Sequence, residues 1–70
     1  MDKLTQQDCQ RILACLDPDQ LSVSEIHQRV GLSVPRITAL LHTLQGQGLV
    51  VSPGCTRNRK GMPVNLWART

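Results

Sequence analysis

The sequence predicts a small α+β fold, mainly α-helical, in which three helices are followed by a two-stranded C-terminal β-hairpin. Three observations support this prediction. Apolar residues recur at helical spacing in the first two thirds of the chain, polar caps with Gly or Pro separate those segments, and two short strand-like runs follow. The length of 70 residues suits one domain, so we expect a single domain over residues 1–70.

The first helix is expected to start at Thr5 and to end before Pro18. Thr5-Gln6-Gln7-Asp8 resembles a capping box with Asp in place of Glu. Apolar residues then follow at i, i+3, i+4 and i+7, namely Cys9, Ile12, Leu13 and Leu16. Pro18 should stop the helix, because its ring removes a hydrogen-bond donor and disfavours helical geometry just before it. Leu21 is an isolated apolar residue that could form a short strand.

Two further helices are expected on either side of a short turn at Val30–Ser33. Ser22-Val23-Ser24-Glu25 is a capping box that starts the earlier helix, and Gly31 can take the positive φ that ends it. Ser33 can cap the later helix, 34–47, which has Pro35 in its first turn. The predicted buried stripe of this helix is Ile37, Leu40, Leu41 and Leu44. Its outward face carries Pro35, Ala39, His42 and Gly46, flanked by Arg36, Thr38 and Thr43.

The C-terminal third predicts a hairpin with a basic tip. Leu49–Ser52 has strand character and should end at Pro53-Gly54. Residues 62–68 alternate in polarity, and Pro63 near the start of this run is typical of an edge strand. The connecting loop 55–61 is polar and basic. Trp67, the only aromatic residue, is interpreted as a packing residue rather than a base-stacking one.

The charges are unevenly distributed along the chain. Residues 1–35 carry five acidic and three basic side chains, whereas residues 36–70 carry five basic and no acidic ones. Such a basic half favours a nucleic-acid partner, although chance asymmetry in a short chain is the alternative. A chain this short has little room for a deep pocket, and no catalytic constellation is visible, so we expect no enzyme.

The cysteines indicate reduced thiols in a cytoplasmic protein. The chain has an odd number of cysteines, three, and no CxxC pair, which disfavours a disulfide framework and a tetrahedral zinc site. They are Cys9, Cys15 and Cys55. Cys9 should behave as a small buried hydrophobe, while Cys55 as a redox or iron–sulfur ligand is left as an alternative. We expect no cofactor and no metal. The sequence contains no signal peptide and no membrane-length apolar run.

Two helices joined by a Gly-containing turn form a helix-turn-helix when the second helix presents a polar face. An α-helix fits the major groove of B-DNA, so the expected partner is double-stranded DNA. Arg36 could donate to guanine or phosphate, and Thr38 and Ala39 offer methyl groups to thymine. Ser33 and the open helix N-terminus could hold a phosphate. The candidate groove residues are Ser33, Pro35, Arg36, Thr38, Ala39 and His42.

Several segments resemble the winged helix-turn-helix regulators of bacteria. Gly31-Leu32-Ser33, Ile37–Leu44 and Gly48-Leu49-Val50 resemble their helical core, and Arg59–Pro63 followed by Leu66-Trp67 resembles their wing and closing strand. The antibiotic-resistance and arsenical-resistance repressors show this pattern. The short regulators of pilus operons are nearest in size and wing composition. Ala39 departs from these families, which often have a long polar or basic residue at that position.

The resemblance covers about residues 5–68 and implies a transcriptional regulator. It implies that helix 34–47 enters the major groove and that the wing, 55–61, touches the DNA backbone or the minor groove. The wing residues expected to do so are Arg57, Asn58, Arg59 and Lys60. A merely solvated basic loop is the alternative for this segment.

Two alternatives to this function remain open. The winged domains that bind left-handed Z-DNA also have a Pro-x-x-x-Trp run, as in Pro63–Trp67, but they carry Asn and Tyr where this chain has Thr38 and His42. A winged-helix module that docks on a larger protein is the second alternative. For the DNA-binding regulator we expect a monomer in dilute solution that uses a second regulatory protein or a paired half-site for tight binding.

Overall fold

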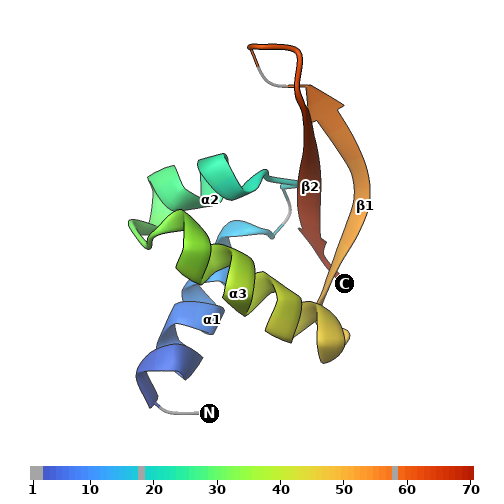
Figure 1. The fold of residues 1–70 in the computed structure, drawn as a ribbon. Coiled ribbons are helices and arrows are strands. Elements are labelled where there is room, and N and C mark those ends of the chain that lie inside the picture. Colours follow the sequence, from blue (N-terminus) through green and yellow to red (C-terminus); the bar gives the residue numbers. More distant parts are fainter. Residues whose placement is uncertain (1–2, 18, 58) are drawn as a thin grey trace.

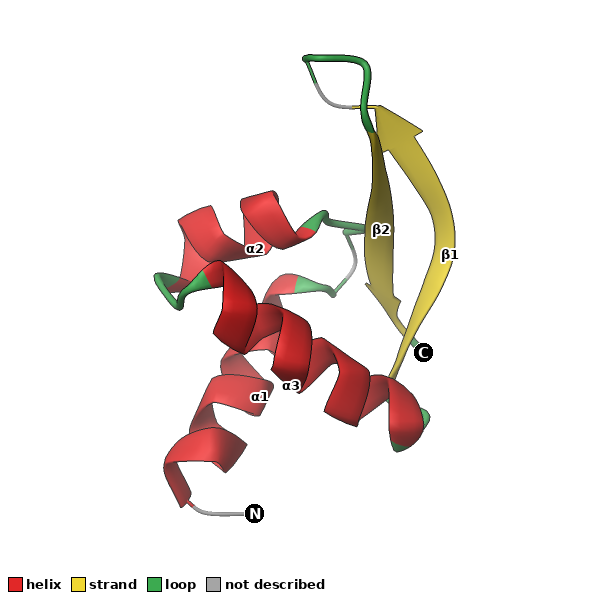
Figure 2. Cartoon of the chain, in the orientation of Figure 1, coloured by secondary structure: helices red, strands yellow, loops and turns green. Residues whose placement is uncertain are grey.

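A computed structural model describes residues 3–17, 19–57 and 59–70 of the chain (Figure 1). The elements in chain order are α1 (Lys3–Cys15), α2 (Val23–Val30), α3 (Val34–Gly46), β1 (Val50–Arg57) and β2 (Pro63–Arg69). The two strands pair antiparallel, and the helices lie together on one side of the hairpin (Figure 2). The predicted order of three helices and a C-terminal hairpin is confirmed.

Helix α1 begins at Lys3, before the predicted cap, so the interpretation of Thr5–Asp8 as a capping box is wrong. Asp8 is instead a buried residue, only 5% exposed, and its carboxylate binds a side chain of α3. Cys9 and Ile12 are buried on the same helix, and Leu16 is buried just after it, whereas Leu13 is only partly buried. Pro18, the residue expected to end this helix, lies outside the described residues.

The start and end of α2 follow the predicted local signals. The Glu25 N–H donates to Ser22 Oγ at 3.3 Å, and the Ser22 N–H donates to Glu25 Oε1 at 3.1 Å, which completes the capping box. Gly31 ends the helix with a φ of 78°, and its N–H donates to the His27 carbonyl at 2.9 Å. The turn into α3 is therefore set by residues within a few positions of it.

Replacing Gly31 by Ala should lower the free energy of unfolding by about 1 kcal/mol, because a Cβ disfavours the left-handed conformation. A Cβ at Gly31 would meet no atom within 4 Å, so the loss would come from backbone strain alone. The matched control is Gly46→Ala, whose Cβ is equally unobstructed in helical backbone and should cause no loss. Urea denaturation measures both, and equal stability of the two variants would contradict the assignment.

Helix α3 has the cap and the buried face that the sequence predicts. The Arg36 N–H donates to Ser33 Oγ at 3.4 Å, Pro35 lies in the first turn, and Gln47 is the C-cap. The residues buried on this helix are Ile37, Leu40, Leu41 and Leu44. Its remaining surface faces solvent or the neighbouring elements.

Strand β1 continues through Pro53 and Gly54 to Arg57, so the predicted end at Ser52 is wrong. The register changes from Val51 opposite Ala68 to Gly54 opposite Leu66, which gives β1 one extra residue. A β-bulge of this kind accommodates a proline, which has no N–H to donate to the ladder. The hairpin is consequently longer, and the predicted loop 55–61 shortens to the turn after Arg57.

Trp67 joins the hairpin to the helices. Leu21 forms an isolated antiparallel bridge with it, through N–H to carbonyl hydrogen bonds of 2.8 and 3.0 Å. Trp67 is 6% exposed and belongs to the core, which confirms its interpretation as a packing residue. The helix-facing side of the sheet therefore carries Trp67 and Val50, while the alternate β2 residues Val64, Leu66 and Ala68 are only partly buried. Met62 lies before β2 and is exposed.

Candidate nucleic-acid interface

The outer face of α3 is open to solvent. Pro35, Ala39 and His42 are exposed, and Thr38 is half-buried at the edge of this face. The Thr38 hydroxyl donates to the Val34 carbonyl at 3.0 Å, so its proton is already used within the helix. Ser33, exposed at the N-terminus of α3, accepts the capping bond described above. Five of the six predicted groove residues thus lie on or beside one open helix face.

Arg36 is the exception, because its guanidinium points at α1. Its Nε donates to Asp8 Oδ2 at 2.9 Å, its Nη2 lies 2.8 Å from the same oxygen, and Nη2 also donates to Thr5 Oγ1 at 3.5 Å. The side chain is 38% exposed, whereas that of Asp8 is 8% exposed. The outward orientation predicted for Arg36 is therefore not the one in the structure, where a buried carboxylate attracts the guanidinium.

A second arginine extends this contact to the turn between α2 and α3. Arg11 Nη1 lies 3.8 Å from Asp8 Oδ1, and Arg11 Nη2 donates to the Val30 carbonyl. Thr5, Asp8, Arg11 and Arg36 together form what we call the Asp8 cluster. This cluster ties α1 to the start of α3 and to the turn before it, so it fixes how the helix-turn-helix is held on the rest of the molecule.

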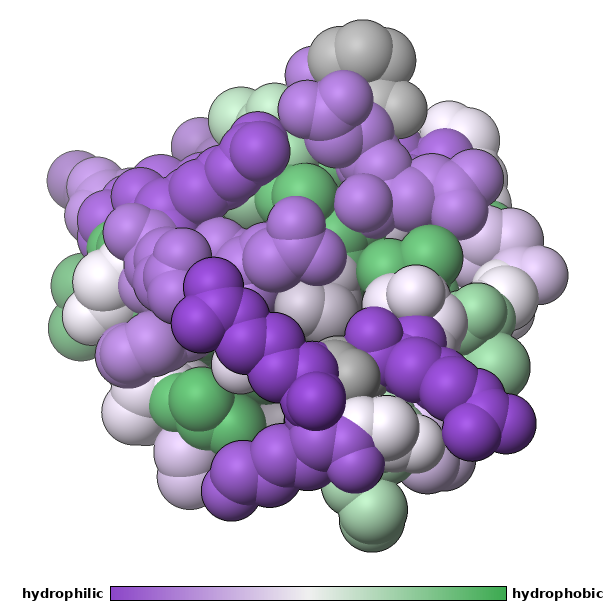
Figure 3. All heavy atoms as spheres, turned by 90° about the horizontal axis from the view of Figure 1, so that it is seen from above, coloured by the Kyte–Doolittle hydropathy of each residue, from purple (hydrophilic) through white to green (hydrophobic). Residues whose placement is uncertain are grey.

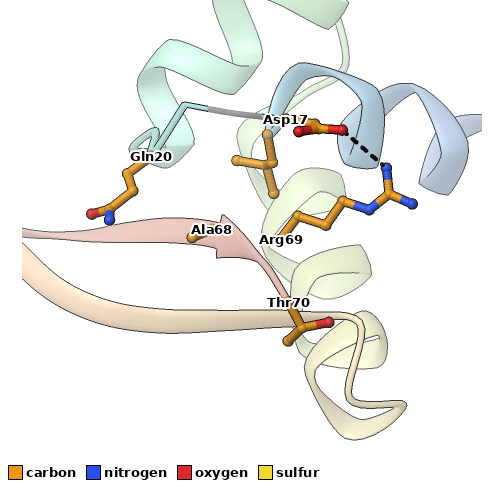
Figure 4. A pocket seen from close by; sticks show the side chains of 6 residues that line it. Asp17, Gln20, Ala68, Arg69 and Thr70 are labelled. Carbon is orange, nitrogen blue, oxygen red and sulfur yellow. Dashed lines mark ion pairs between the residues drawn. The ribbon is translucent and has the colours of Figure 1, made fainter.

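Two further arginines are paired with aspartates on the surface. Arg29 Nη1 lies 3.5 Å from Asp19 Oδ2, and Arg69 Nη1 lies 3.7 Å from Asp17 Oδ2 (Figure 4). The Arg69 pair borders an open hollow of about 590 Å³ whose lining contains no α3 residue. Arg11, Arg29, Arg36 and Arg69 therefore each lie against a carboxylate, and all four lie outside the tip of the hairpin.

The tip of the hairpin holds the basic side chains predicted for the wing. Arg57 ends β1, Arg59 and Lys60 lie in the following turn, and all three are exposed. Within the described part of the chain, neither Arg57 nor Arg59 has a carboxylate partner. Asn58, the fourth predicted wing residue, lies outside the described residues. Among the described residues, Arg57 and Arg59 therefore differ from the four arginines that lie against a carboxylate, and the tip that carries them extends beyond the helices (Figure 1).

An aromatic contact links the open face of α3 to the hairpin. The rings of His42 and Trp67 have centroids 6.1 Å apart and are tilted by 53°. His42 is exposed while Trp67 is buried, so the imidazole covers the indole at the surface. No pattern in the sequence indicates this contact, because His42 and Trp67 are brought together only when β2 packs beside α3.

The thiols differ in burial. Burial raises the pKa of the Cys9 thiol and also that of the Cys15 thiol, so both favour the protonated, unreactive form at neutral pH. Cys55 is exposed on β1.

Among the described residues, no group of three His, Cys, Asp or Glu side chains is placed to hold a metal ion. No described helix has the length and apolar character needed to span a bilayer.

We expect a thiol reagent to modify Cys55 first. In the native protein at neutral pH, one thiol per chain, that of Cys55, should react rapidly with Ellman's reagent. Cys9 should react only after unfolding, because thiolate character and access both control the rate. Cys55→Ser should remove the fast phase, and Cys15→Ser is the control that should retain it. A fast phase that survives Cys55→Ser would contradict the burial assigned to the other two thiols.

Comparison with known proteins identifies related domains. The model of the IclR helix-turn-helix domain matches residues 11–54. No curated protein sequence matches the chain. Among solved structures, the Zalpha domain of PKZ from Carassius auratus, in complex with Z-DNA, is similar with a TM-score of 0.75 and 19% identity over 97% of this chain and 100% of that chain.

Two structures of mutant ZitR from Lactococcus lactis are also similar. Their TM-scores are 0.74 and 0.73, each at 25% identity, over 91% and 90% of this chain. The chain spans 42% and 41% of these two ZitR chains. The likeness to the Zalpha domain shows the fold alone. The fold is therefore a winged helix, in which α2 and α3 form the helix-turn-helix and the hairpin of β1 and β2 forms the wing.

Proposed function

The chain belongs to the family of IclR helix-turn-helix domains, and from this membership we propose that it is a small transcriptional regulator that reads specific double-stranded DNA. This family consists of DNA-binding regulator domains rather than enzymes. In the proposed complex, α3 enters the major groove and the tip of the wing contacts the backbone or the minor groove. The observation that carries this proposal is the open outer face of α3, together with two exposed wing arginines, Arg57 and Arg59, that have no carboxylate partner among the described residues.

The proposal divides base reading from backbone binding. Thr38, Ala39 and His42 would lie against base edges, with Pro35 and Ser33 at the phosphates near the helix N-terminus. Arg57, Arg59 and Lys60 would neutralise phosphates and supply most of the salt-dependent affinity. Arg36 would contribute through the Asp8 cluster, by holding α3 in place, rather than by contacting a base. Ala39 offers only a methyl group, so we expect modest sequence preference from that position.

The proposal is tested by titrating the protein into mixed genomic fragments and then into selected duplexes at 50 and 200 mM salt. With three or more phosphate contacts, the affinity should fall at least tenfold between the two conditions, roughly as the 0.9 power of salt for each contact. The protein should bind a selected duplex more tightly than a scrambled one at both salt concentrations. Absence of duplex binding, together with salt-insensitive association with a protein, would favour the protein-docking module instead.

A further inference from the structure

A hollow of about 270 Å³ lies between the first turn of α2, the outer side of α3 and strand β2. Its lining residues are Ser22, Val23, Ser24, Val34, Thr38, His42, Val64, Asn65 and Trp67. The hollow is thus bounded by both parts of the proposed interface, with α3 as one wall and β2, which carries the wing tip, as another. Neither the family match nor the sequence pattern assigns it a ligand.

The lining of the hollow is chemically mixed, and none of the residues that form it carries a carboxylate. Ser24 and Asn65 are exposed and bring a hydroxyl and an amide, both of which can donate hydrogen bonds. Val34 is 44% exposed, so it offers apolar surface to the hollow. Glu25, the acid adjacent to Ser24, is held by the capping bond from the Ser22 N–H and does not line the hollow.

Seen from the side of the wing tip, the molecule shows the same mixture. Hydrophilic side chains cover most of this face, and hydrophobic ones appear as small separate patches between them (Figure 3). Large continuous apolar patches mark protein-docking surfaces, whereas the apolar patches on this face are small and separate. Small apolar patches beside hydrogen-bond donors and basic side chains suit a chain of alternating sugars and phosphates better.

The geometry of B-DNA indicates which part of the duplex would face the hollow. The major groove, about 12 Å wide, and the adjoining minor groove, about 6 Å wide, are separated by the sugar–phosphate backbone of a single strand. If α3 lies in the major groove and the wing tip reaches the neighbouring minor groove, that strand must pass between α3 and β2. The hollow is the space between those two elements.

We propose that this hollow seats a deoxyribose–phosphate segment of the DNA strand that runs between α3 and the wing. Ser24 and Asn65 donate hydrogen bonds to phosphate oxygens, and Val34 packs against the adjacent sugar. This inference rests on the proposed function, and it adds Ser24 and Asn65 to the interface. Serine and asparagine are among the side chains that commonly bind phosphate and sugar in protein–DNA complexes.

The test introduces a negative charge into the hollow by Ser24→Glu. An acid in the first turn of a helix is compatible with the helix dipole, so the fold should be retained, which circular dichroism and a thermal melt would verify. The matched control is Gln10→Glu, an exposed α1 residue that lines no part of the hollow and changes the net charge equally. At 50 mM salt, Ser24→Glu should weaken binding of the selected duplex by about tenfold, and the deficit should shrink at 200 mM as salt screens the repulsion.

A second variant and a modified duplex locate the contact. Asn65→Ala should weaken binding by about threefold to tenfold, the value of one hydrogen bond. Ethylation of individual phosphates should reveal one phosphate whose modification weakens the wild type but not Asn65→Ala. If the wild type binds the duplex while Ser24→Glu and Gln10→Glu bind equally well, the hollow lies off the DNA and this inference fails alone. If the wild type binds no duplex, the proposed function fails with it.

Discussion

Replacing Arg57, Arg59 and Lys60 together by alanine should weaken duplex binding by about a hundredfold near 0.15 M salt and flatten the salt slope by up to about 2.7 units. The physical reason is that each phosphate neutralised by a basic side chain releases condensed counterions, which contributes about 0.9 to the slope of log affinity against log salt. Affinity should fall for all sequences alike, while the preference among sites should persist, since backbone contacts carry little base information.

The control for this variant removes three basic side chains from outside the tip of the wing. Lys3, Arg29 and Arg69 are exposed, and the two arginines already lie against Asp19 and Asp17. Their replacement by alanine changes the net charge equally, but it should leave the salt slope within about one unit of the wild type. Thermal melts should show both proteins folded. Equal losses in the two triple variants would mean that net charge matters and the wing position does not, while an unchanged slope in the wing variant would make the tip a solvated loop.

Replacing Arg36 by alanine should lower the free energy of unfolding by about 1–3 kcal/mol, since it leaves the Asp8 carboxylate buried without its nearest partner. For a domain of this size, each 1 kcal/mol corresponds to a shift of roughly 4–8 °C in melting temperature. Arg11, at 3.8 Å and more exposed, is too distant from the carboxylate to compensate fully. DNA affinity should fall as well, because the cluster holds the start of α3 against α1.

A double-mutant cycle separates this pairing from other effects of the substitutions. If the ion pair accounts for the loss, Asp8→Ala and Arg36→Ala together should cost less than the sum of the single variants, with a coupling of about 1 kcal/mol or more. Arg29→Ala, which breaks an exposed ion pair of the same type, should change stability by less than about 0.5 kcal/mol. Unchanged stability of Arg36→Ala with a selective loss on one guanine-containing site would instead make Arg36 a direct base contact.

The sequence alone determined the parts of this protein whose signals act within a few residues. The capping box at Ser22–Glu25, the left-handed Gly31 and the cap at Ser33 are short-range hydrogen-bonding and φ preferences, so they located the helix-turn-helix correctly. Helical periodicity identified the buried stripe of α3 and therefore also its open face. The winged-helix order of elements followed from these signals and the strand-like runs after them.

Only the tertiary structure decided which distant residues meet. Asp8 reads locally as a helix cap, yet it is paired with Arg36, 28 residues away, because a half-buried guanidinium is the partner that makes a buried carboxylate tolerable. Pro53 reads as a strand end, yet β1 passes through it by a bulge, because the partner strand supplies the rest of the ladder. The His42–Trp67 contact and the hollow bounded by α2, α3 and β2 likewise exist only once the hairpin packs on the helices. Local preferences fix each element, whereas burial and charge pairing between elements depend on packing that no short segment encodes.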